Sequence, residues 1–240
     1  MRKHDLSVVL PSYNTKDLEK NVSEIQKEIE KITRNYEIIV VNDGSTKEWK
    51  NESKKLKEQK NSKIKILSYD INKGKGYALK KGGMIAKGEK IVFLDSDLDI
   101  PPRQIKFFLD ELENEDIVIG SKRHPKSKII YPVSRKFMSS IYQKLNSVLF
   151  NLNVKDTQVG IKAFHSHVLK KNLPKLTIKR YVFDLELLVV ANKENYKIKE
   201  VPVEIKYKFG STINMKSVLN MLWETAAIFY RLKIRRHYDK

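Results

Sequence analysis

The feature that most constrains the fold is an apolar strand that runs directly into three alternating carboxylates. Residues 91–94 read Ile-Val-Phe-Leu, a continuous apolar run typical of a parallel strand that helices cover on both faces. Asp95, Asp97 and Asp99 follow this run and precede two prolines. In an open α/β sheet, ligands bind beyond the carboxyl ends of the strands. The segment therefore predicts a parallel sheet with a ligand site at this strand end.

The three carboxylates indicate a bound cation. Crowded negative charges repel one another, and a carboxylate taken out of water is costly unless a cation or strong donors compensate it. Mg²⁺ or Mn²⁺, which prefer oxygen ligands, would compensate Asp95, Asp97 and Asp99. An isolated D-x-D is more often a solvated acidic turn. The loops after the neighbouring strands favour the metal site in this chain.

The first half of the chain alternates strand patterns with helix patterns. Apolar residues at helical spacing predict helices at about 17–33, 77–86 and 104–112, with a charged helix running to about residue 60. Strands are predicted at 6–10, 37–41, 64–67, 91–94 and 117–120. This order predicts an α/β fold with a mostly parallel, Rossmann-like sheet flanked by helices.

Three loops that follow predicted strands offer groups that fit a nucleotide. Pro11 and Tyr13 follow the first strand and can stack on a base. Asn42 and Asp43 follow the second and can hydrogen-bond the base. Residues 72–76, Asn-Lys-Gly-Lys-Gly, can bring backbone N–H groups and lysines close to phosphates at a helix start. They match neither a Walker A loop nor a dinucleotide fingerprint, so we predict a nucleoside diphosphate held by base contacts, a metal and cations.

The positive charge is concentrated in the second half of the chain. The 240 residues carry a net charge of +19, of which residues 1–120 contribute +2 and residues 121–240 contribute +17. Such asymmetry favours an anionic partner, whether a phosphorylated ligand, an anionic membrane surface or a nucleic acid. A lysine excess that serves only solubility is the alternative. The absence of cysteine excludes thiolate catalysis and a Cys-ligated zinc site.

Two later segments predict amphipathic helices with basic flanks. Neither they nor the rest of the chain contains the ~18 uninterrupted apolar residues of a spanning helix, and the apolar run before Pro11 is too short for a signal peptide. We therefore expect a soluble or peripheral protein. Aromatic residues and flanking cations suit helices that lie in a membrane interface, and packing on the sheet is the alternative. The apolar positions are Phe137, Met138, Ile141, Leu145, Val148 and Leu149 in the segment 132–150, and Met215, Leu219, Leu222, Trp223, Ala226, Phe229 and Tyr230 in the segment 213–240.

Several long segments, taken together, resemble the family-two inverting glycosyltransferases. They are LSVVLPSYN, EIIVVNDGST, NKGKGYALKKGGMIAKGEKIVFLDSDLDIPP, IVIGSK, DTQVGIKAF and RYVFDLELLVVANKENYKIKEVPVEIKY. Within that family the chain is similar to the polyprenyl-phosphate glycosyltransferases, the dolichyl-phosphate glucose and mannose synthases. The resemblance implies a GT-A fold over residues 1–212, and the amphipathic basic helix predicted over 213–240 follows it. It also implies a nucleotide-sugar donor and transfer with inversion.

The resemblance also implies roles for individual residues. Asp95 and Asp97 match the D-x-D that contacts donor and metal, and Asp99 matches a position that can join the metal shell. Lys122 stands where the family usually has arginine, which weakens bidentate phosphate binding there, and Arg123 or Arg135 could supply that fork for the acceptor phosphate. The implied donor site comprises Pro11, Tyr13, Asn42, Asp43, Lys73, Gly74, Asp95, Ser96 and Lys122.

One further motif bears on the sugar. Residues 156–160, Asp-Thr-Gln-Val-Gly, resemble the D-T-Q-x-G of the glucose synthases more than the mannose synthase loop. The segment with Asp184 and Glu186 favours the same assignment. We therefore expect UDP-glucose as donor, with GDP-mannose as the alternative. Gln158 is predicted to contact substrate and to join Asp95 and Asp97 in the catalytic set.

The expected acceptor determines the expected chemistry. A lipid phosphate is largely anionic at neutral pH, with a second pKa near ~6, so it can attack the anomeric carbon without a strong base. A carboxylate base such as Asp156 or Asp184 would then be unnecessary, although a hydroxyl acceptor would require one. The enzyme would position its substrates, and a metal on Asp95 and Asp97 would stabilise the departing diphosphate.

Other functions make different predictions. A relative with a saccharide acceptor needs no lipid, and a nucleotidyltransferase releases pyrophosphate from a nucleoside triphosphate. A nucleic-acid-binding protein would explain the charge but not the three carboxylates, and we expect no nucleic-acid partner. We expect as partners a nucleotide-sugar, a polyprenyl phosphate, an anionic membrane surface and a separate membrane protein. The expected location is the cytoplasmic face of a membrane.

Overall fold

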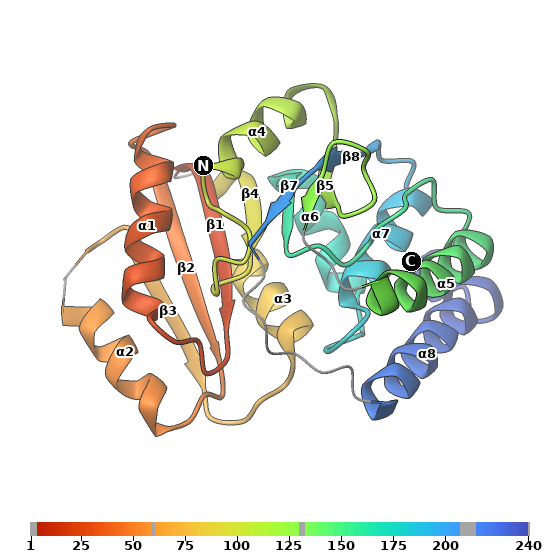
Figure 1. The fold of residues 1–240 in the computed structure, drawn as a ribbon, viewed down its shortest axis with the longest axis horizontal. Coiled ribbons are helices and arrows are strands. Elements are labelled where there is room, and N and C mark those ends of the chain that lie inside the picture. The colour runs from red at the N-terminus through yellow and green to blue at the C-terminus, as the bar shows by residue number, and fades with distance from the viewer. Residues whose placement is uncertain (1–3, 59–60, 130–132, 207–214, 240) are drawn as a thin grey trace.

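The computed structural model has a seven-stranded sheet at its centre, with helices on both faces (Figure 1). It describes residues 4–58, 61–129, 133–206 and 215–239, and for 47, 48, 50, 51, 133–141 and 215 it describes the backbone alone. The strand order is β3-β2-β1-β4-β7-β5-β8, and a two-stranded sheet pairs β6 with β9. The strands are β1 (His4–Ser12), β2 (Tyr36–Asp43), β3 (Ile64–Tyr69), β4 (Gly88–Leu94), β5 (Ile117–Ser121), β6 (Lys128–Ile129), β7 (Ile161–His165), β8 (Ile198–Pro202) and β9 (Glu204–Ile205).

The large sheet is parallel except at one strand. β1 pairs in parallel with both β2 and β4, β2 with β3, and β5 with β8. β7 is antiparallel to its two neighbours, β4 and β5. Because β1, β2 and β4 run in the same direction, their carboxyl ends lie at one edge of the sheet. The predicted α/β fold with a mostly parallel sheet is confirmed.

Side chains that alternate along the strands build one core on each face of the sheet. Val8 packs in the core that includes Leu18 of α1 and Phe108 of α4, whereas its neighbour Val9 packs in the core that includes Leu79 of α3. The helices are α1 (Leu18–Glu30), α2 (Lys47–Glu58), α3 (Lys75–Ile85), α4 (Gln104–Glu111), α5 (Val133–Phe150), α6 (Ser166–Asn172), α7 (Phe183–Lys193) and α8 (Met215–Phe229).

The two predicted amphipathic helices, α5 and α8, lie side by side at one end of the molecule (Figure 1). The Tyr142 hydroxyl lies 2.8 Å from the Thr225 hydroxyl, and the rings of Phe150 and Phe229 are 6.5 Å apart. A π-helical turn, Tyr230–Ile234, continues α8. No helix within the described residues is long and apolar enough to cross a bilayer.

The end of the chain also packs into the main core. Ile228 of α8 and Tyr238 are almost completely buried in the same cluster as α3 and α7. The Tyr238 hydroxyl donates a hydrogen bond of 2.6 Å to the buried Glu186 carboxylate of α7. The segment 213–240 was predicted as an appended helix, and its described part contributes to the core of the preceding residues.

Candidate active site

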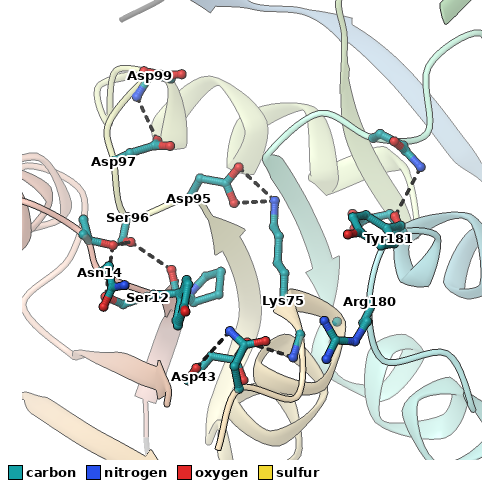
Figure 2. A pocket seen from close by; sticks show the side chains of 18 of the residues that line it. Ser12, Asn14, Asp43, Lys75, Asp95, Ser96, Asp97, Asp99, Arg180 and Tyr181 are labelled. Carbon is teal, nitrogen blue, oxygen red and sulfur yellow. Dashed lines mark hydrogen bonds and ion pairs between the residues drawn. The ribbon is translucent and has the colours of Figure 1, made fainter. Parts of the chain in front are cut away.

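A cavity of about 990 Å³ opens at the carboxyl ends of β1, β2 and β4. Its volume is at the upper end of the range typical of small-molecule sites. The wall contains the residues after β4, the loop after β1 and the start of α3 (Figure 2). The fold therefore brings together three loops that the sequence predicted to meet.

Asp95 faces a lysine across this cavity. The Lys75 ammonium, at the start of α3, lies 2.6 Å from one Asp95 carboxylate oxygen and 2.8 Å from the other (Figure 2). Burial opposes the charged form of Lys75, but the Asp95 and Asp184 carboxylates raise its pKa. Lys75 therefore carries its positive charge at the point where the resemblance places a donor diphosphate.

Gly160 determines how closely Asp95 can approach β7. A Cβ atom at Gly160 would lie 2.2 Å from an Asp95 carboxylate oxygen, which is far inside contact distance. The Asp95 amide also donates to the Gly160 carbonyl at 3.1 Å. The glycine of the Asp-Thr-Gln-Val-Gly motif is therefore required by the position of the first carboxylate.

Asp97 and Asp99 lie on a turn that follows Asp95. Leu98 between them has a φ of 58°, in the left-handed region that non-glycine residues seldom adopt. The Asp99 amide donates to the Asp97 carboxylate at 3.1 Å. Loss of hydration in the cavity, and then the neighbouring Asp95 carboxylate, raise the pKa of Asp97. A cation bound beside Asp97 would therefore favour its charged form.

The carboxylates fit a divalent metal as a donor set, although they do not form a closed cage. Among the described residues, no group of three acidic or imidazole side chains is arranged to hold a metal ion. In Figure 2 the Asp95 carboxylate points to Lys75, while Asp97 and Asp99 lie farther along the turn. Carboxylate oxygens are donors that suit Mg²⁺ or Mn²⁺. Asp97 and Asp95 would hold the ion beside the substrate cavity.

The first loop is tied to the D-x-D by hydroxyl groups. The Ser96 hydroxyl donates to the Pro11 carbonyl at 2.8 Å and lies 2.9 Å from the Thr15 hydroxyl. The Asn21 side chain of α1 donates to the Ser96 carbonyl at 2.9 Å. Tyr13 lines the same part of the cavity and is about half exposed, at 53%. This arrangement leaves the Tyr13 ring available to stack on a base.

Asp43 holds the glycine-rich loop in place. Its two carboxylate oxygens accept hydrogen bonds from the backbone amides of Lys73 and Gly74, each at 2.8 Å. These two amides were predicted to face phosphates, and in the structure they bind Asp43 instead. The Lys73 ammonium lies over the rings of Tyr69 and Tyr77 and does not line the cavity. Lys75 is the lysine of this loop that reaches the cavity.

Two other carboxylates near the site are paired with lysines. Asp184 lines the cavity, and its carboxylate lies 2.9 Å from the ammonium of the buried Lys162. Burial lowers the pKa of Lys162, and the Asp184 carboxylate opposes this shift. Asp156 is buried and lies 3.4 Å from the Lys122 ammonium. Each carboxylate is already engaged by an ammonium group, so neither is free to act as a general base.

The wall opposite the first loop is formed by Gln158, Arg180, Tyr181 and Asp184. The Gln158 side chain lies in the cavity and donates to the Tyr181 carbonyl at 3.3 Å. Within the described part of the chain, no acidic side chain forms an ion pair with the exposed Arg180. Arg180 is therefore available to bind an anion.

Most of the predicted site residues lie on the cavity wall. They are Pro11, Tyr13, Asp43, Gly74, Asp95, Ser96, Asp97, Asp99 and Gln158. Lys122 and Arg123 do not line the cavity, and Asn42 instead accepts a hydrogen bond from the Ser45 amide in its own turn. Arg135 falls in α5, and its side chain lies outside the described residues.

Lys75, Thr15 and Arg180 are among the cavity residues that were absent from the predicted site. Lys75 belongs to the glycine-rich segment, but the spacing does not show which of its lysines faces inward. Thr15 belongs to the first loop, where its hydroxyl lies 2.9 Å from that of Ser96. Arg180 is the first residue of the family-like segment RYVFDLELL, which also contains Asp184, and this position is the signal that could have identified it.

Comparisons with known proteins place the chain in a family. The sequence model described as "Glycosyl transferase family 2" matches residues 7–173. A dolichyl-phosphate beta-glucosyltransferase of Trichomonas vaginalis is 30% identical over 257 residues, which cover 97% of this chain and 77% of that protein. A dolichyl-phosphate beta-glucosyltransferase of Dictyostelium discoideum is 30% identical over 249 residues, which cover 94% of this chain and 74% of that protein.

Solved structures share the fold. Glucosyl-3-phosphoglycerate synthase from Mycobacterium tuberculosis, in complex with Mn²⁺, uridine diphosphate and phosphoglyceric acid, has a TM-score of 0.69 and 19% identity, and the match covers 95% of this chain and 78% of that one. A mannosyltransferase from Pyrobaculum calidifontis, in complex with GDP-Man and Mn²⁺, has a TM-score of 0.62 and 16% identity, over 97% and 65% of the two chains.

These matches confirm the resemblance seen in the sequence and the GT-A type of fold. The family match covers more than half of the chain and includes the first loop, the glycine-rich loop and the D-x-D. The carboxylates at the end of β4 thus lie in the part of the chain that the family shares. This chain belongs to glycosyltransferase family 2 and is a glycosyltransferase.

Proposed function

We propose that this enzyme transfers glucose, with inversion, from UDP-glucose to a polyprenyl phosphate of the dolichyl type at a membrane surface. The observation that carries the proposal is the cavity whose wall holds Asp95 and Asp97 together with Lys75, which pairs with Asp95, and the exposed Arg180. Carboxylates that can hold a metal, beside cations that can bind phosphates, suit a nucleotide-sugar donor and a phosphate acceptor. The names of the relatives that are 30% identical support both glucose and dolichyl phosphate.

The chain's own residues would bind and orient the donor. Tyr13 offers a ring for the base, and Asp95 and Asp97 lie where the diphosphate would meet the metal. Mg²⁺ or Mn²⁺ held there would stabilise the negative charge that builds up on the leaving diphosphate. Lys75, which pairs with Asp95, lies within the same cavity and could bind the diphosphate.

The acceptor supplies its own nucleophile. A phosphate monoester is anionic at neutral pH, so attack on the anomeric carbon needs alignment and no proton removal. The lysine pairs of Asp156 and Asp184 fit this requirement, because a hydroxyl acceptor would need one of them free as a base. Attack from the side opposite the diphosphate inverts the anomeric configuration.

The exposed face of α5 and α8 supports peripheral binding to a membrane. Trp223 is 77% exposed, Leu219 60% and Val148 76%, and Arg231 and Lys233 follow the apolar stretch of α8. Large apolar side chains with adjacent cations are typical of helices that lie in a membrane interface. We propose that this face binds the cytoplasmic surface of an anionic membrane, where the enzyme can meet its lipid acceptor and a separate membrane protein that would use its product.

A transfer assay tests the proposal. UDP-glucose and GDP-mannose, each labelled in the sugar, are supplied separately with Mn²⁺ or Mg²⁺, with and without a short polyprenyl phosphate. We expect metal-dependent label in the lipid from UDP-glucose. Label from GDP-mannose alone would replace the donor assignment, and label in a water-soluble saccharide without lipid would refute the acceptor assignment.

A further inference from the structure

The segment 177–182 forms the side of the cavity that carries Arg180. It leads from β7 and α6 into α7, and it covers the glycine-rich loop. The Tyr77 amide donates to the Lys179 carbonyl at 2.9 Å, and a Cβ atom at Gly74 would lie 2.6 Å from Cγ of Arg180. With its φ of 102°, Gly74 leaves room for this arginine. Figure 2 shows Arg180 and Lys75 on the same side of the cavity.

Glu186 of α7 holds the beginning of this segment. The carboxylate is fully buried and accepts hydrogen bonds from the Thr177 amide at 2.9 Å, the Thr177 hydroxyl at 2.8 Å and the Ile178 amide at 2.7 Å. Tyr238, near the end of the chain, donates to the same carboxylate at 2.6 Å. The C-terminal residues thus reach the first anchor of the segment.

Glu224 of α8 holds the other end. One of its carboxylate oxygens accepts hydrogen bonds from the amides of Tyr181 and Val182, each at 3.1 Å. The Tyr181 hydroxyl lies 3.2 Å from the hydroxyl of Ser217, which precedes Glu224 by about two turns of α8. Arg180 therefore lies directly before two amides that α8 fixes.

We propose that Glu224 is a positioning residue that acts through Arg180, and that Arg180 binds a phosphate of the substrates. The proposal rests on the proposed function and extends it, because it makes α8 part of the phosphate-binding wall as well as part of the exposed apolar face. The phosphate belongs either to the donor diphosphate or to the lipid acceptor. An arginine held by a fixed backbone loses less freedom on binding an anion than a free side chain does.

The alternative to a positioning role is that Glu224 acts only as a helix cap. A carboxylate at the N-terminus of α7 stabilises the helix through its free amides and its dipole. If Glu224 is only a cap, its replacement lowers the melting temperature, and it changes the activity by the same factor whether Arg180 is present or replaced. A positioning residue makes the effects of the two substitutions non-additive.

The experiment compares Glu224→Ala, Arg180→Ala, the double variant and Glu224→Gln, which keeps a carbonyl acceptor. Asn220→Ala, an exposed position on the same helix, is the matched control. Three quantities are measured: hydrogen exchange of the peptide covering residues 177–182, binding of UDP with Mn²⁺, and kcat and KM for UDP-glucose and for a short polyprenyl phosphate.

We expect Arg180→Ala and Glu224→Ala each to reduce kcat/KM by roughly tenfold or more, and the double variant to be little worse than Arg180→Ala. Glu224→Ala should accelerate exchange in residues 177–182, while Glu224→Gln should recover part of the activity and Asn220→Ala should resemble the unmodified enzyme. A rise in UDP dissociation constant assigns Arg180 to the donor, and a rise only in the KM for the lipid assigns it to the acceptor.

Multiplying effects in the double variant, or an Arg180→Ala enzyme with unchanged binding and kinetics, would overturn the proposal. Unchanged exchange in Glu224→Ala would do the same. Failure of the proposed function looks different: the unmodified enzyme would bind UDP without transferring glucose to lipid. The exchange and UDP-binding measurements need no acceptor, so in that case they still decide whether Glu224 acts through Arg180.

Discussion

At the scale of single residues, the position of Asp95 depends on the absence of a side chain at Gly160. We expect Gly160→Ala to displace the Asp95 carboxylate, because the added methyl group would lie 2.2 Å from one of its oxygens. The displacement should lower kcat by about a hundredfold, as for other misplaced charges in a preorganised site. Kinetics and Mn²⁺ binding measure the loss, and circular dichroism controls for folding. Normal Mn²⁺-dependent activity in a folded Gly160→Ala enzyme would show that Asp95 can move without consequence.

Asp97→Asn separates catalysis from stability. The variant should lose roughly a hundredfold or more in transfer, because an amide is a poorer ligand for a hard cation. Loss of hydration and the Asp95 carboxylate raise the pKa of Asp97. A carboxyl whose pKa is raised in the folded state favours the fold when protonated, and this contribution is lost as the pH rises through the folded-state pKa.

The melting temperatures of both proteins, measured without metal across a pH series, test this sign. At neutral pH we expect Asp97→Asn to melt at the same temperature as the unmodified protein or higher. The difference should shrink at acidic pH, where Asp97 is protonated in both the folded and the unfolded state. A variant that is clearly less stable at neutral pH would contradict a raised pKa at this position.

The position of Lys75 leads to a prediction about how tightly the nucleotide-free protein binds a metal ion. Lys75→Met removes the cation that contacts both oxygens of Asp95, so Mn²⁺ should bind the nucleotide-free protein more tightly, by roughly tenfold. The same variant should bind UDP more weakly. Lys81→Met, on the same helix and exposed, is the matched control for the loss of one charge. Equal Mn²⁺ affinities of the two variants would mean that the ion pair with Asp95 does not compete with the metal.

Residues differ in how far the sequence predicts their roles. Asp95 and Asp97 could be predicted because an apolar strand fixes where its next residues lie, and the loops after β1 and β2 were assigned in the same way. The partners of Asp95 could not be predicted from the sequence, since Lys75 and Gly160 come from distant segments that only the folded chain brings together. Arg180 is placed by carboxylates 6 and 44 positions away, on Glu186 and Glu224.

At the scale of elements, α8 presents an apolar face whose membrane role can be tested without disturbing its packing. Leu219 and Trp223 are exposed, whereas Ile228 of the same helix is buried. We expect Leu219→Ser with Trp223→Ser to weaken binding to anionic vesicles by tenfold or more, since burial of each large apolar side chain contributes about 1.5–3 kcal/mol. Vesicle sedimentation measures the binding. Phe107→Ser on α4, an exposed apolar residue elsewhere, should leave it unchanged.

In this experiment the melting temperature shows whether the double substitution has also disturbed the packing of α8, apart from removing its exposed apolar face. Unchanged vesicle binding in a folded Leu219→Ser, Trp223→Ser variant would remove this face from the membrane contact.

The strands and helices of the first half were predicted from periodicity because each spans several turns or alternations. The antiparallel insertion of β7 between β4 and β5 was not, because pairing direction depends on where the chain returns and leaves no local pattern.

At the scale of the whole molecule, the packing of the C-terminal segment predicts that residues 1–213 do not form an independent domain. The boundary at 212 came from the resemblance, which extends to about that residue. In the structure, Ile228 and Tyr238 lie in the core with α7, and Tyr238 donates to the buried Glu186. Loss of either large side chain from a core costs roughly 2–5 kcal/mol, and Glu186 would also lose a hydrogen bond.

We therefore expect deletion of residues 214–240 to lower the melting temperature by about 10 °C or more, or to give insoluble protein, even without any membrane present. Tyr238→Phe, which keeps the ring and removes only the hydrogen bond to Glu186, should cause a smaller loss of about 1–3 kcal/mol in the free energy of unfolding. Thermal and urea unfolding measure both effects. A truncated protein that melts like the full chain would establish 1–213 as a domain of its own, with α8 serving only as an attachment to the membrane.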